Sequence, residues 1–88
     1  MMEGIMITGC AGFIGSHAVD YFLHKGDSVV GVDCLTYAGS VENLNHSSKN
    51  KNFTFYHVDI CETEKIKSIC REENIQWIIN FAAETHVD

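Results

Sequence analysis

The sequence has few basic residues: 6 Lys and Arg stand against 12 Asp and Glu, for a formal net charge of −6 at pH 7. They are scattered and form no patch that could follow a phosphate backbone. An acidic chain of this kind is a poor partner for nucleic acid, and we expect none. No apolar run approaches the ~20 residues that a membrane-spanning helix needs, so we expect no membrane partner either.

Paired metal-binding or redox motifs are also missing. The four cysteines form no CxxC pair and no zinc-finger spacing, and the histidines show no ligand spacing, so we predict no metal site. The first residues lack both the basic start and the apolar core of a secretory signal. We therefore expect free thiols in a reducing, cytoplasmic setting.

The sequence alternates short apolar runs, typical of strands, with segments of helical periodicity. We predict strands over 4–8, 28–32, 53–58 and 76–82, and helices over 13–25 and 63–73. The long polar connection over 34–52 has room for a helical turn near 41–44. This alternation predicts right-handed crossovers and a parallel sheet in the order 3-2-1-4. The predicted fold class is α/β, the N-terminal half of a doubly wound Rossmann sheet, with an apolar edge at the fourth strand.

Three glycines stand at intervals of three where the first strand turns into the first helix: Gly9, Gly12 and Gly15. A pyrophosphate needs such a backbone, because glycines allow close approach and helix N–H groups face the anion. Asp33 ends the next strand, eighteen residues after Gly15. In dinucleotide-binding folds, a carboxylate about 20 residues after the glycines binds the ribose hydroxyls. A carboxylate there repels a 2′-phosphate, which favours NAD over NADP. The alternative is that Asp33 is a solvated acid at a strand end.

These motifs resemble a known family. The Gly-x-x-Gly-x-x-Gly spacing resembles the extended branch of the short-chain dehydrogenase/reductase superfamily. Residues 33–39 and 42–44 resemble the ribose-side loop of nucleotide-sugar 4,6-dehydratases, above all those acting on dTDP-glucose. Residues 59–61 resemble the family's adenine-side segment, and 81–88 resemble its fourth-strand signature. Two positions depart from the family pattern: Cys10 replaces a common glycine, and Cys34 replaces a common lysine.

The resemblance implies a set of residues around a bound NAD: Gly9, Gly12, Phe13, Ile14, Gly15, Asp33, Cys34, Leu35, Thr36, Asp59, Ile60, Phe81, Ala82, Ala83, Glu84 and Thr85. Phe13 and Ile14 would face the pyrophosphate through their backbone. Residues 33–36 would line the ribose, and 59–60 would hold the adenine edge. Residues 81–85 would run beside the nicotinamide half of NAD. Thr85 would also touch the sugar of a nucleotide-sugar substrate.

The resemblance further implies the chemistry of the whole enzyme, expected to be a homodimer. Bound NAD takes a hydride from C4 of a nucleotide-linked hexose, water is eliminated across C5 and C6, and the hydride returns to C6. Tyr21 and Lys25 fit the superfamily's Tyr-x-x-x-Lys pattern, but they fall on the first helix, whereas the family's catalytic pair follows the fourth strand. We therefore predict no catalytic residue in this chain.

We interpret residues 1–88 as the N-terminal part of an NAD-binding domain, without the substrate domain. Three alternatives remain open. One is a sister enzyme, such as a UDP-sugar 4-epimerase, a UDP-glucose 4,6-dehydratase or a decarboxylase. Another is a non-catalytic cofactor-binding fragment, and the third is a complete small Rossmann protein.

Overall fold

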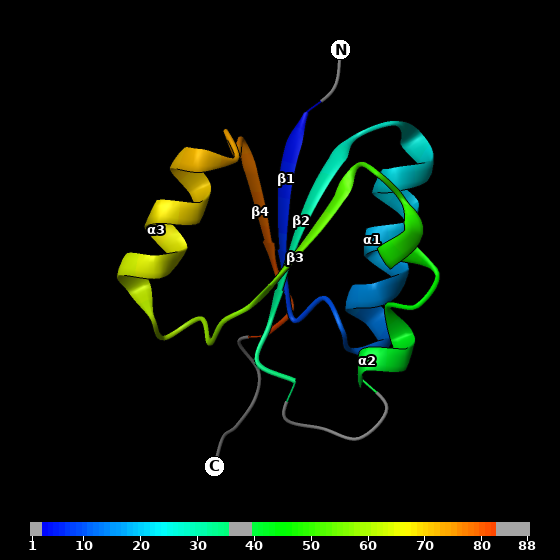
Figure 1. The fold of residues 1–88 in the computed structure, drawn as a ribbon, viewed down its shortest axis with the longest axis horizontal. Coiled ribbons are helices and arrows are strands. Elements are labelled where there is room, and N and C mark those ends of the chain that lie inside the picture. The colour runs from blue at the N-terminus through cyan, green and yellow to red at the C-terminus, as the bar shows by residue number, and fades with distance from the viewer. Residues whose placement is uncertain (1–2, 36–39, 83–88) are drawn as a thin grey trace.

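The computed structural model describes residues 3–35 and 40–82. Its elements follow one another as β1 (Gly4–Thr8), α1 (Phe13–Lys25), β2 (Ser28–Asp33), α2 (Ser40–Asn43), the 3₁₀ helix η1 (Ser47–Lys49), β3 (Phe53–His57), α3 (Thr63–Glu72) and β4 (Trp77–Asn80). The strands form a parallel sheet in the order β3-β2-β1-β4. Helices α1 and α2 lie on one face of this sheet and α3 lies on the other (Figure 1). The predicted fold class and strand order are confirmed.

The last two elements end earlier than the sequence predicts. The N–H of Phe81 still donates to the carbonyl of Thr8, but the N–H of Ala82 donates to Asn80 Oδ1 instead. This local turn ends β4 at Asn80 rather than at residue 82. Helix α3 ends at Glu72, one residue early, because Asn74 adopts a left-handed conformation with φ +55°.

Alternating side chains of the strands form a core on each face of the sheet. Ile5, Ile7 and Val29 pack toward α1, where they meet Val19 and Leu23. The opposite face carries a smaller cluster in which Met6, Val30 and Val32 pack against Ile69 of α3. Ile69 is the one residue of α3 that is buried, so α3 covers its face less tightly than α1 does.

Strand β4 forms one edge of the sheet. It pairs with β1 in register from Ile5↔Trp77 to Thr8↔Asn80, and within the described chain its other side has no neighbouring strand. Trp77 and Ile78 are 61% and 55% exposed. An apolar strand of this kind is typical of the interior of a parallel sheet. None of the described helices is both long and apolar enough to cross a membrane.

Candidate functional site: the glycine loop at the carboxyl edge of the sheet

The glycine loop is packed too closely to carry side chains at two of its three glycines. Gly9 turns the chain out of β1 with φ +68°, and a Cβ placed there would lie 3.0 Å from the backbone nitrogen of Ala82. A Cβ on Gly15 would lie 2.1 Å from the carbonyl oxygen of Gly9. The loop therefore sits between the start of α1 and the end of β4, and backbone atoms set its shape.

Gly12 caps α1 and leaves the first turn of the helix open. Its N–H donates to the carbonyl of Gly9 (3.1 Å), and its own carbonyl accepts the first bond along the helix from Ser16 (2.8 Å). The N–H groups of Phe13, Ile14 and Gly15 precede that bond and have no partner within the helix. No side chain caps this end, and its first turn has no acidic residue. These N–H groups and the helix dipole favour an anion at this position.

The side chains of Phe13 and Ile14 point to solvent, with 72% and 65% of their surfaces exposed. Neither side chain contributes to the core, so their place at the helix start is compatible with a role for the backbone alone. The sequence predicts that role, and it stays a prediction.

Asp33 lies beside the glycine loop at the end of β2 and is 4% exposed. Its Oδ2 accepts the N–H of Ala11 (2.9 Å), and its Oδ1 accepts the N–H of Leu35 (2.8 Å). Leu35 itself is held in a left-handed conformation with φ +55°. The carboxylate therefore holds the backbone of the glycine loop and of the segment that follows β2. The ribose contact that the sequence predicts for Asp33 stays a prediction.

The adenine-side residues follow β3 at the same edge of the sheet. The N–H of Val58 donates to the carbonyl of Asp33 (3.2 Å), and His57 Nε2 lies 3.1 Å from the carbonyl oxygen of Cys34. Asp59 accepts the N–H of Cys61 (2.8 Å), and Ile60 packs half-buried near the Met6 cluster.

The structure thus brings together, at one end of the sheet, the predicted residues that it describes: Gly9, Gly12, Phe13, Ile14, Gly15, Asp33, Cys34, Leu35, Asp59, Ile60, Phe81 and Ala82. Thr36, Ala83, Glu84 and Thr85 lie outside the described residues.

Cys10 fills the space of a missing side chain on β2. A Cβ on Gly31 would lie 2.6 Å from Cys10 Sγ, so this glycine makes room for the thiol. Cys10 is fully buried. Burial, and to a smaller extent the negative charge of Asp33, raise the pKa of the Cys10 thiol to about 12. The departure from the family's glycine at this position is therefore accommodated within the core.

The sequence predicts no role for one residue that contacts the glycine loop. Asn43, the last residue of α2, donates from Nδ2 to the carbonyl of Ala11 over 2.7 Å. The sequence shows Asn43 only as part of the 42–44 run that resembles the dehydratases. A contact across 32 positions leaves no periodic signal, so the residue type alone could not reveal this bond.

Comparison with known proteins agrees with this arrangement. The family model described as GDP-mannose 4,6 dehydratase matches residues 6–88. The chain belongs to this family. It is 44% identical over 85 residues to a dTDP-glucose 4,6-dehydratase of Escherichia coli, which covers 96% of this chain and 24% of that protein. The chain thus spans about a quarter of the length of this relative.

Two solved structures resemble this family member closely. One is dTDP-glucose 4,6-dehydratase from Bacillus anthracis in complex with NAD, with a TM-score of 0.87 and 35% identity over 94% of this chain and 27% of that one. The other is UDP-glucose 4-epimerase from Thermotoga maritima with UDP-glucose, with a TM-score of 0.78 and 38% identity over 93% of this chain and 25% of that one.

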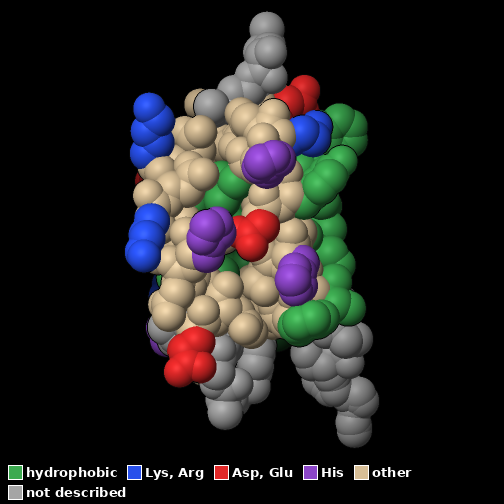
Figure 2. Space-filling model, turned by 90° about the vertical axis from the view of Figure 1, so that its right-hand side faces the viewer, with side chains coloured by type: hydrophobic (Ala, Val, Ile, Leu, Met, Phe, Trp, Pro, Cys, Tyr) green, Lys and Arg blue, Asp and Glu red, His purple; other side chains and the backbone are tan. Residues whose placement is uncertain are grey.

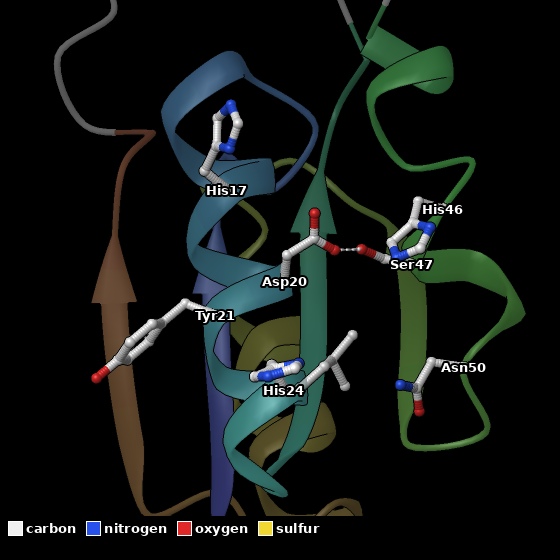
Figure 3. Close-up of a pocket in the computed structure, with 8 residues that line it drawn as sticks. His17, Asp20, Tyr21, His24, His46, Ser47 and Asn50 are labelled. Carbon is white, nitrogen blue, oxygen red and sulfur yellow. Dashed lines mark hydrogen bonds between the residues drawn. The ribbon is translucent and has the colours of Figure 1, made fainter.

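A hollow in this GDP-mannose 4,6-dehydratase family member lies away from the glycine loop, on the outer side of α1. It is a cavity of about 380 Å³ lined by His17, Asp20, Tyr21, Leu23, His24, His46, Ser47 and Asn50. Histidine side chains gather around an acidic one on this face (Figure 2). Asp20 and Ser47 point toward one another, with the Ser47 hydroxyl donating to Asp20 over 2.6 Å (Figure 3). Among the described residues, no group of three or more potential ligands is placed to hold a metal ion.

Tyr21 and Lys25, which match the Tyr-x-x-x-Lys pattern, lie in the second half of α1, beyond the turn that faces the loop. Tyr21 is 62% exposed and points away from Asp20 and Ser47 (Figure 3). Lys25 forms an ion pair with Asp27 over 3.4 Å. Neither side chain belongs to the loop at the carboxyl edge of the sheet.

Proposed function

We propose that this chain is the N-terminal, NAD-binding part of a nucleotide-sugar 4,6-dehydratase that converts dTDP-glucose to dTDP-4-keto-6-deoxyglucose. The observation that carries the proposal is the uncapped start of α1 beside Gly9, Gly12 and Gly15. Free helix N–H groups and glycine backbone at the carboxyl edge of a parallel sheet form a site for a dinucleotide's phosphates. The likeness to a dTDP-glucose 4,6-dehydratase crystallised with NAD supports the choice of cofactor and reaction.

When bound, NAD supplies the acceptor and donor of the hydride, and the protein supplies position and electrostatics. In the proposal, the N–H groups of Phe13, Ile14 and Gly15 bind the pyrophosphate. Asp33 accepts hydrogen bonds from the adenosine ribose and disfavours a 2′-phosphate, while Cys34 to Thr36 line the ribose. Asp59 and Ile60 hold the adenine edge.

Residues 81–85 belong to the nicotinamide half in this proposal, and Thr85 also touches the sugar of the nucleotide-sugar substrate. The catalytic acid and base and the substrate domain belong to parts of the enzyme other than residues 1–88, and the whole enzyme is a homodimer. Tyr21 and Lys25 take no part in the reaction.

The cofactor assignment is tested with the 88-residue chain itself. Titration with NAD, followed by ¹H–¹⁵N NMR, should show weak binding with the largest shifts at the amides of 9–15. NADP should bind at least tenfold more weakly, because its 2′-phosphate meets the Asp33 carboxylate. Asp33→Asn should reduce this difference. An absence of shifts at the amides of 9–15, or equal binding of NAD and NADP, would contradict the proposal.

The reaction is tested with a longer polypeptide that contains this segment, incubated with dTDP-glucose and with UDP-glucose. A 4-keto-6-deoxy product is expected, with dTDP-glucose as the preferred substrate. The second candidate is a UDP-sugar 4-epimerase, favoured by the likeness to the Thermotoga maritima epimerase. A 4-epimer product without a 4-keto sugar would decide for the epimerase and against the dehydratase.

A further inference from the structure

The glycine loop is held at Ala11 by two side chains from outside it. Asp33 accepts the Ala11 N–H through Oδ2 (2.9 Å), and Asn43 donates to the Ala11 carbonyl through Nδ2 (2.7 Å). We propose that Asn43 is a positioning residue, which fixes the loop in the form that presents the helix N–H groups to phosphate. This inference rests on the proposed function and extends it to a residue that would not touch the cofactor.

Each of the two bonds fixes the plane of one peptide group. Because a peptide unit is planar, the bond from Ala11 N–H to Asp33 orients the peptide between Cys10 and Ala11. The bond from Asn43 orients the next peptide, whose N–H belongs to Gly12. That N–H donates to the carbonyl of Gly9 (3.1 Å) and leads directly into α1. Asn43 thereby sets the direction of the chain at the point where the anion-binding turn begins.

Asn43 can act in this way because its own segment is anchored. Leu44, the next residue, is 6% exposed and packs in the core on the α1 face. Three residues further, the hydroxyl of buried Ser47 donates to Asp20 of α1 over 2.6 Å. The amide donor is thus attached to α1 and to the core on its C-terminal side. Its position is fixed relative to the helix whose start it helps to place.

The chemistry of the side chain suits this role. A carboxamide donates a hydrogen bond without carrying charge, so Asn43 can hold a carbonyl beside an anion site and leave the local charge unchanged. A lysine or arginine at this position would itself attract the phosphate, and an aspartate would repel both the Ala11 carbonyl and the anion. Asn43 therefore affects phosphate binding through the geometry of the loop.

The experiment compares three variants of the 88-residue chain. Asn43→Leu keeps a similar size but removes the donor, and Asn43→Gln keeps a donor on a longer side chain. Asn45→Leu makes the same chemical change two residues away, at an exposed position. Amide hydrogen exchange is measured by NMR without ligand, and NAD affinity is measured by titration.

In Asn43→Leu, we expect the Gly12 amide to exchange about tenfold faster and NAD to bind about fivefold more weakly. Asn45→Leu should match the parent chain in both measurements, and Asn43→Gln should recover part of the loss. Equal Gly12 exchange in the two leucine variants would overturn the role of Asn43. So would a uniform rise in exchange over all elements, which indicates lost stability rather than a loosened loop.

The exchange measurement separates this inference from the function on which it rests. If a longer polypeptide that contains this segment does not bind NAD, the proposed function is contradicted, whatever the exchange rates are; if only the 88-residue chain fails to bind NAD, the exchange of the Gly12 amide alone decides the role of Asn43. If NAD binds equally well to the parent and to Asn43→Leu, the proposed function stands and the positioning role of Asn43 is overturned.

Discussion

At Gly15 the start of α1 comes closest to the backbone of the glycine loop. We predict that Gly15→Ala will destabilise the chain by about 1–3 kcal/mol, the usual cost of overpacking. The new Cβ would lie 2.1 Å from the Gly9 carbonyl oxygen, and a backbone atom cannot move away as a flexible side chain can. Urea unfolding measures the loss, and NMR should show shifted amides throughout 9–15.

Gly26→Ala is the control for this prediction. A Cβ there would meet no atom within 4 Å, but the residue has φ +100° and caps the C-terminus of α1. Its cost, about 1–2 kcal/mol, should come from the left-handed conformation alone and should leave the loop amides unchanged. If Gly15→Ala left those amides unchanged as well, the tight approach would be disproved.

Cys10 should be chemically inert in the folded chain. Its thiol is fully buried, and its pKa is raised to about 12, so almost no thiolate is present at pH 8. We predict that a disulfide reagent at pH 8 will label Cys10 only after unfolding. Exposed Cys61 should be labelled first, although its hydrogen bond to Asp59 raises the pKa of that thiol too. Labelling of Cys10 in the native state would contradict the packing over Gly31.

The raised pKa of Cys10 also has a consequence for stability. The folded chain holds the thiol proton more tightly than the unfolded chain, whose cysteine titrates near 9.0. The resulting stabilisation is complete below pH 9 and is lost as the pH rises toward about 12. In Cys10→Ala, we predict a smaller loss of unfolding free energy between pH 9 and 11 than in the parent chain. An identical slope in both would show that the thiol does not contribute.

At the scale of elements, α3 is attached to the sheet by few strong contacts. Tyr56 of β3 donates its hydroxyl proton to Glu73 at the end of α3 over 2.6 Å. This bond to a carboxylate is the main cause that raises the pKa of Tyr56 to about 12. We predict that Tyr56→Phe will lower stability by about 1 kcal/mol and will speed amide exchange in α3 more than in α1.

Tyr21→Phe is the matched control, because Tyr21 is exposed on α1. It should leave the unfolding free energy and the exchange of α3 unchanged. The alkaline absorbance titration of the parent should contain a tyrosine component near pH 12 that is missing from Tyr56→Phe. If both variants behaved alike, the bond to Glu73 would contribute nothing to the docking of α3.

The limits of α1 were predictable because they depend on local signals. Gly12 and Gly26 flank the apolar stripe, and the helix runs over Phe13–Lys25 as the sequence predicts. The end of β4 was not predictable from local signals, because it depends on whether the Ala82 N–H bonds to the neighbouring strand or to the Asn80 side chain. The hydrogen bond from Asn43 to Ala11 could not be predicted from the sequence either, because it forms only when α2 packs against the loop.

At the scale of the whole molecule, the order of the strands could be predicted from the order of the elements along the chain. Alternation of strands and helices permits few parallel arrangements, and the glycine loop marks β1 as a central strand. The packing partners were harder to predict. Nothing in the pattern of β2 indicates that Gly31 makes room for Cys10, because the two residues meet only after β1 and β2 have paired.

The exposed edge of β4 gives the last prediction. Trp77 and Ile78 are more than half exposed, and the strand carries no charge or proline that would discourage pairing. We predict that the 88-residue chain associates reversibly as its concentration rises, despite its net charge of −6. Ile78→Lys should shift this association to at least tenfold higher concentration, because pairing at this edge would have to accommodate a charge.

Tyr21→Lys is the control, since it adds the same charge at an exposed aromatic residue on α1, away from the β4 edge. Sedimentation velocity over a concentration series measures the association of all three chains. Each lysine reduces the magnitude of the net charge of −6 by one, so a net-charge effect would strengthen association in both variants. If the two lysine variants weaken association equally, the β4 edge is not the specific contact. If only Ile78→Lys weakens it, the exposed edge of β4 is the surface through which two copies of this chain associate.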